Sequence, residues 1–112
     1  MFVGSGIIEL LIAESRSLKE KRAVLKSVLK RTQNEFNVSI AEIGDNELWG
    51  RAKIGFSVVG NDHRFVDGKI SHMIHFIENL RSAEVVNVKV EIMGFSDEMP
   101  PVSYEEKKYD TI

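Results

Sequence analysis

Basic side chains are concentrated in residues 15–35, where their number would suit the binding of phosphate groups. Lysine and arginine outnumber acidic residues there by seven to two, a local balance of +5 in a chain whose net charge is −2. The rest of the chain therefore carries −7, so the positive charge is a local feature. Lysine and arginine gathered on one face form the electrostatic footprint of a surface that contacts nucleic-acid phosphates.

Four of these basic residues fall together if the stretch is helical. At about 100° per residue, Lys19, Lys26 and Lys30 share one flank and Arg22 lies beside them. Trp49 and Arg51 would extend this surface, the tryptophan by stacking or anchoring a ligand. Two other interpretations stay open. The lysines could form only a solvated helix face, and the tryptophan could cover the end of the core.

No group of residues has the spacing of a catalytic or cofactor site. The sequence has no nucleophile–base pair, no phosphate-binding or dinucleotide-binding glycine motif, and no cysteine. His72 and His75 have the i, i+3 spacing of two metal ligands, but no third strong ligand accompanies them. We therefore expect neither an enzyme activity nor a bound metal or cofactor.

The basic stretch carries the signals of an amphipathic helix over residues 17–34. Ser17 and Glu20 form the S-x-x-E pattern of a capping box, which predicts that the helix begins at the serine. Lys21 and Arg22 interrupt the margins of the apolar side, and we expect their long side chains to extend outward to solvent. The apolar side itself, which should face the core, is formed by Leu18, Leu25, Val28, Leu29 and Thr32.

The remaining segments predict four strands and a second helix. We expect the helix over residues 62–81 and the strands over residues 2–13, 36–43, 51–59 and 84–95. This order, β-α-β-β-α-β, predicts an α+β, ferredoxin-like fold, with a four-stranded antiparallel sheet and both helices on one face. The inward residues of the last strand should be Val86, Val88, Val90 and Ile92.

Two further expectations follow from this topology. The start of the first helix and the connection between the second and third strands should lie at the same end, which brings residues 15–22 near residues 44–51. The face of the sheet away from the helices should be open, partly apolar and without aromatic rings, so base stacking on it is not expected. Such a face favours self-association. The main alternative to nucleic-acid binding is therefore a homo-oligomeric protein-interaction module joined through the open sheet.

The length of 112 residues predicts one domain, residues 1–95, followed by an acidic, proline-containing tail, residues 96–112. The negative charge of the tail could let it fold over the basic flank and compete with RNA. No apolar run has the length of a membrane-spanning helix, and no signal peptide is recognisable. With the absence of cysteine, this favours a cytoplasmic protein that does not associate with membranes.

Four short segments occur in a recognisable order: SLKEKR at 17–22, FNVSIAE at 36–42, LWGRA at 48–52 and VGND at 59–62. Together they resemble the YlxP-like family of small bacterial proteins of unknown function, over about residues 1–94. Members usually have serine and glutamine where this chain has Gly60 and Gly50.

The resemblance implies a ferredoxin-like fold and assigns no enzyme activity to a named residue. Because the family's genes often lie beside those of translation-initiation and ribosome-binding factors, it also implies a role near RNA or the small ribosomal subunit.

Overall fold

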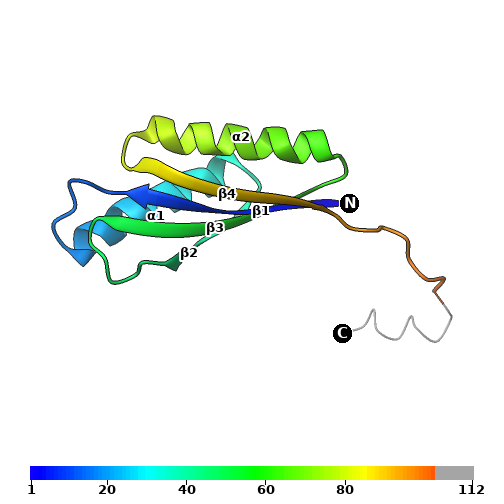
Figure 1. Cartoon of the computed structure of the whole chain (residues 1–112), viewed down its shortest axis with the longest axis horizontal. Helices are drawn as coiled ribbons and strands as arrows, with labels where there is room; N and C mark the ends of the chain where they lie inside the picture. The colour runs from blue at the N-terminus through cyan, green and yellow to red at the C-terminus, as the bar shows by residue number, and fades with distance from the viewer. Residues whose placement is uncertain (103–112) are drawn as a thin grey trace.

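A computed structural model describes residues 1–102 of the chain. One antiparallel sheet and two helices make up the folded part of these residues (Figure 1). The strands pair in the order β2-β3-β1-β4, so β1 and β3 are central and β2 and β4 are edges. This arrangement confirms the predicted α+β, ferredoxin-like fold. The elements are β1 (Phe2–Leu11), α1 (Leu18–Glu35), β2 (Ser39–Gly44), β3 (Arg51–Gly60), α2 (His63–Leu80) and β4 (Glu84–Gly94).

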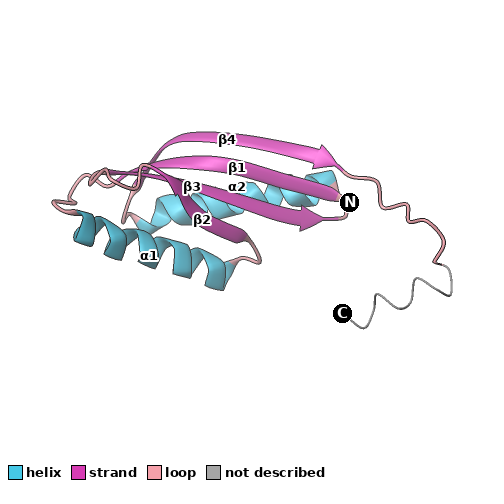
Figure 2. Cartoon of the chain, turned by 90° about the horizontal axis from the view of Figure 1, so that it is seen from below, coloured by secondary structure: helices cyan, strands magenta, loops and turns pink. Residues whose placement is uncertain are grey.

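Both helices lie on one face of the sheet, and the hydrophobic core fills the space between the two layers (Figure 2). Alternate residues of the central strands point into this space because side chains of a strand alternate between its two faces. From the sheet, the buried apolar side chains are Ile8, Leu10, Ile40, Ala52, Ile54, Phe56 and Val58. From α2, they are Val66, Ile70, Met73 and Ile77, at the helical period that the sequence predicts.

Two glycines of β1 allow other groups to approach the sheet closely. A Cβ atom added at Gly4 would lie 2.6 Å from Cδ1 of Ile70 in α2. One added at Gly6 would lie 2.5 Å from the Phe56 ring and 2.5 Å from the backbone oxygen of Lys89. Carbon atoms in ordinary contact are about 3.5–4.0 Å apart. The close packing of α2 and of Phe56 against β1 therefore depends on having no side chain at Gly4 and Gly6.

A bulge in β4 changes which valines face the core. The pairing with β1 joins Glu9 to Asn87 but Leu10 to Val85, so Val86 is the extra residue. Val85 packs against the core, whereas Val86 is 45% exposed. The prediction that Val86 points inward is therefore wrong, because strict alternation does not hold across a bulge.

The start of α1 confirms Ser17 as the residue that caps the helix. The backbone N–H of Glu20 donates to Oγ of Ser17 at 3.1 Å. The Glu20 carboxylate accepts from the backbone N–H of Arg16 at 2.6 Å, one residue earlier than a capping box requires. The glutamate therefore fixes the turn that leads into the helix, and the serine hydroxyl accepts from a free backbone N–H of the first helical turn.

Residues 96–102 form no helix or strand, and they leave the sheet after β4 as an exposed segment (Figure 1). The last part of the expected tail, with Glu105, Glu106 and Asp110, lies outside the described residues. The domain boundary at residue 95 and the contact of the tail with α1 therefore stay predictions. Neither helix in the described part of the chain is long and apolar enough to cross a membrane.

Candidate functional site

An open groove of about 570 Å³ lies between α1 and the edge strand β2. Arg22, Lys26 and Lys30 line it from α1, four residues and thus about one helical turn apart. Leu25 and Leu29, one buried and one partly buried, supply the apolar part of the lining. The groove therefore presents a row of positive charges beside an apolar surface.

The charges of this row are accessible. All three basic side chains are exposed, and none of them lies within ion-pair distance of a carboxylate among residues 1–102. Lys19 is also exposed and lies on the same flank of α1 by its spacing, but it does not line the groove. A ligand could therefore contact the row without first breaking ion pairs in the described part of the protein.

Lys21 is buried, so the prediction that it extends to solvent is wrong. Only 1% of its surface is exposed, and its ammonium group donates to the backbone oxygen of Asp45. The same group lies 3.4 Å from Oε2 of Glu42. These contacts join the start of α1 to the β2–β3 connection, which confirms that the two segments lie at the same end. Position 21 is at the centre of the apolar side of the helix, which is the signal that could have indicated burial.

Among residues 1–102, Glu42 is the one acidic residue that lines the groove. Its carboxylate is occupied by the ion pair with Lys21, so it offsets little of the positive charge of the row. Near the other end of the lining, Nε2 of Gln33 donates to the backbone oxygen of Ile40 at 3.4 Å and connects α1 to β2. The strand β2, on the side of the groove opposite the basic row, is therefore joined to α1 near both ends of the groove.

Trp49 and Arg51 do not line the groove. Trp49 is 55% exposed in the β2–β3 connection, so a large part of its ring is accessible to a ligand. Arg51 is exposed at the start of β3, where it pairs with Leu11 of β1. Of the six predicted contact residues, the structure brings Arg22, Lys26 and Lys30 into one groove and leaves Lys19, Trp49 and Arg51 outside it.

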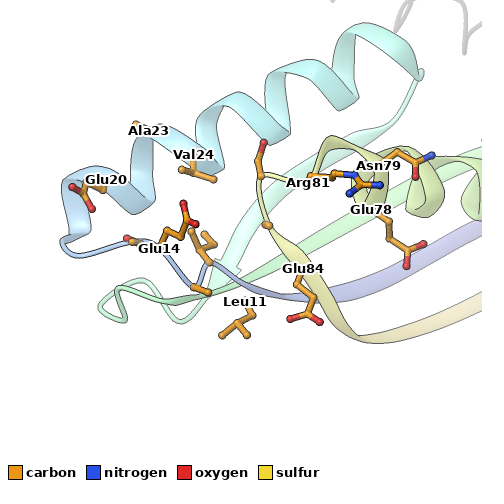
Figure 3. Close-up of a pocket in the computed structure, with 14 residues that line it drawn as sticks. Leu11, Glu14, Glu20, Ala23, Val24, Glu78, Asn79, Arg81 and Glu84 are labelled. Atoms are coloured by element: carbon orange, nitrogen blue, oxygen red, sulfur yellow. The ribbon is translucent and has the colours of Figure 1, made fainter.

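A larger cavity of about 970 Å³ lies where the β1–α1 loop meets α1 and the end of α2 (Figure 3). Within the described part of the chain its lining is acidic, with Arg81 as the one basic residue and four glutamates, Glu14, Glu20, Glu78 and Glu84. In Figure 3 the four carboxylates do not converge on a common point. Within residues 1–102, no three His, Cys, Asp or Glu side chains are placed to hold a metal ion. The acidic lining of this cavity does not suit a phosphate.

The open face of the sheet carries both polar and apolar side chains. Asn87 donates to Oε1 of Glu9 at 3.0 Å near one end. Toward the other end, Val59, Val3 and Met93 lie in register across β3, β1 and β4. The valine of β3 is 60% exposed and the methionine 63% exposed, so this apolar row is open to contact.

Comparison with known proteins gives a family but no activity. Residues 3–90 match the model of a family described as a protein of unknown function (DUF503). The uncharacterized protein YlxP of Bacillus subtilis (strain 168) is 39% identical over 82 residues, which cover 73% of this chain and 89% of YlxP. Among solved structures, the de novo designed protein Foldit4 is similar with a TM-score of 0.49 and 16% identity. The similarity covers 86% of this chain and 100% of that protein.

Proposed function

This chain belongs to the DUF503 family of proteins of unknown function, and we propose that it binds RNA through the groove between α1 and β2. The observation that supports this proposal is the row of Arg22, Lys26 and Lys30 in one groove, exposed and without carboxylate partners among the described residues. Proteins that hold single-stranded nucleic acid commonly use a positive groove that follows the backbone. We propose binding rather than catalysis.

The lining of the groove fits a nucleotide chain better than an isolated phosphate. The basic row offers successive contacts about one helical turn apart, and the partly buried Leu29 beside it offers apolar surface to a sugar or base. Lys19, Trp49 and Arg51 would extend the contact at the end where Lys21 joins α1 to the hairpin. Contacts to phosphate position the protein without reading sequence. RNA within the small ribosomal subunit is therefore a suitable target, and it requires a cytoplasmic location.

Charge reversal of the basic flank tests this proposal. We expect the Lys19→Glu, Lys26→Glu, Lys30→Glu variant to bind single-stranded RNA at least about tenfold more weakly than the native chain at low salt. The slope of log affinity against log salt should be about −3 for four phosphate contacts and should become shallower in the variant. Fluorescence anisotropy with a labelled mixed-sequence oligonucleotide measures both quantities, and purified small subunits serve as the second probe.

A matched control changes the same amount of charge elsewhere. The Arg31→Glu, Arg64→Glu, Arg81→Glu variant reverses three exposed charges that do not line the groove. It should keep most of the affinity. Equal losses in the two variants would show that RNA responds only to net charge, and absence of binding by the native chain would refute the proposal. Circular dichroism confirms that both variants stay folded.

Self-association through the open face is a second candidate function, favoured by the exposed row of Val59, Val3 and Met93. The change Val59→Glu places a charge in this apolar row, on β3, without altering the core. If two copies join there, light scattering should show that the variant is more dissociated than the native chain. An unchanged molar mass would exclude this face as the contact.

A further inference from the structure

The edge strand β4 has free hydrogen-bonding groups along its outer side. Met1 and Phe95 exchange both backbone hydrogen bonds, at 2.7 and 3.0 Å. In an antiparallel pair, residues bonded to the neighbouring strand alternate with residues whose groups point away. The register with β1 therefore directs the odd-numbered residues to β1 and leaves N–H and C=O groups pointing outward at Val88, Val90 and Ile92. Of these, only the N–H of Val88 has a partner among the described residues, Oδ1 of Asn87 at 3.0 Å.

The side chains of the same positions are apolar and only partly covered. Val88 and Val90 face the helices, but each is 37% exposed because β4 is the last strand of the sheet. Natural proteins usually protect such edges with proline, inward charges or a short strand. Here β4 is 11 residues long and contains no proline. The positions whose backbone groups point outward carry valine, apart from Ile92 and the final Gly94. Such an edge can accept a further strand.

Charges on the open side of β4 indicate which strand would fit. Lys89 and Glu91 are exposed on either side of Val90, and neither has an ion-pair partner among residues 1–102. We propose that β4 pairs antiparallel with β4 of a second copy, with a two-fold axis at Val90. Lys89 then lies opposite Glu91 of the partner subunit, and the reciprocal pair forms as well. Two ion pairs and the outward backbone groups are satisfied together.

Other registers of the β4–β4 pair do not satisfy both the ion pairs and the outward backbone groups. Centring the two-fold axis on Lys89 or Glu91 places like charges opposite each other and uses backbone groups that already bond to β1. Centring the axis on Val88 or on Ile92 uses outward backbone groups. The Val88 register, however, sets Lys89 opposite Asn87 of the partner subunit, and the Ile92 register sets Glu91 opposite Met93 of the partner subunit. The Val90 register therefore joins two sheets into one of eight strands, with the α1–β2 grooves at its two far edges.

A charge exchange between copies tests the register. In Lys89→Glu, two pairs of like charge face each other in the dimer, and the same is true of Glu91→Lys. Each variant alone should dissociate at least about tenfold more readily than the native chain in sedimentation velocity. An equimolar mixture of the two variants should recover the native tendency to dimerise, because both cross-strand pairs are then of opposite charge. All measurements use the full chain over a wide range of concentration.

Two further variants separate this contact from others. Val90→Pro removes an outward N–H group and leaves the hydrogen bonds to β1 in place, so it should give a monomer. Val59→Glu alters the open face on β3, away from the β4 edge, and should leave the β4 contact intact. The proposal is wrong if the native chain is monomeric throughout, if Val59→Glu and not the β4 variants abolishes the dimer, or if mixing the two charge variants restores nothing. The charge variants carry the test should the proline variant fail to fold.

Discussion

Replacing Lys21 with alanine is expected to lower the free energy of unfolding by about 3 kcal/mol. The side chain is 1% exposed, and its ammonium group contacts the backbone oxygen of Asp45 and the carboxylate of Glu42. The change leaves both of these oxygens without their partner and removes buried methylene groups as well. Because the side chain of Glu42 is 27% exposed and can be hydrated, the expected loss lies at the lower end of that known for buried ion pairs.

Urea denaturation of the variant and of Lys19→Ala makes this comparison within one helix. Lys19 is exposed and precedes Lys21 by two residues, so its replacement should change the free energy of unfolding by less than about 0.5 kcal/mol. Lys21→Met keeps most of the buried volume and should recover part of the loss. Equal, small effects of the two alanine changes would show that Lys21 is not packed between α1 and the β2–β3 connection.

The second large effect is expected at Gly6, where alanine should lower the free energy of unfolding by about 3 kcal/mol. The added Cβ atom would lie 2.5 Å from the backbone oxygen of Lys89 and from the ring of Phe56. The ring can shift, but the backbone oxygen belongs to β4, and its displacement would weaken the pairing of β4 with β1. For this reason the effect is placed at the upper end of the usual cost of overpacking.

Gly68→Ala provides the matched control. The same methyl group is added where, apart from the adjacent residues and the backbone of its own helix, no atom of the described residues lies within 4 Å. Gly68 is exposed in the middle of α2, so alanine should raise the free energy of unfolding there by about 0.5–1 kcal/mol. Thermal and urea unfolding of the two variants should therefore change in opposite directions. A Gly6→Ala protein as stable as the native one would mean that β4 and Phe56 adjust without cost.

The fold could be predicted because its strongest signals are periodic. Val66, Ile70, Met73 and Ile77 repeat along α2 at the helical period. Boundaries were less predictable where one residue suits two elements. The alternation over residues 36–43 predicts that Phe36 begins a strand. In the structure Phe36 ends α1, donating its N–H to the backbone oxygen of Thr32 at 2.9 Å, and its ring packs edge-on against Phe76. The strand begins only at residue 39.

The site was less predictable because it depends on distances between elements. Helical spacing placed Arg22, Lys26 and Lys30 on one flank, but the groove exists only because β2 lies beside that flank. The inward direction of Lys21 depends on the Asp45 oxygen and the Glu42 carboxylate, which the sequence separates from it by more than twenty residues. The bulge at Val86 likewise arises from pairing between the first and last strands.

The position of β1 in the sheet has a consequence for the order of folding. β1 is made first, yet its pairs with β4 join Phe2 to Gly94 and Ile8 to Val88, close to opposite ends of the domain. Contacts between residues so distant in sequence close a large loop and slow folding. During synthesis, β1 must wait for β4 while its apolar residues have only β3 as a neighbouring strand. The domain can therefore become resistant to proteolysis only after its last strand, β4, has been synthesised and has left the ribosome.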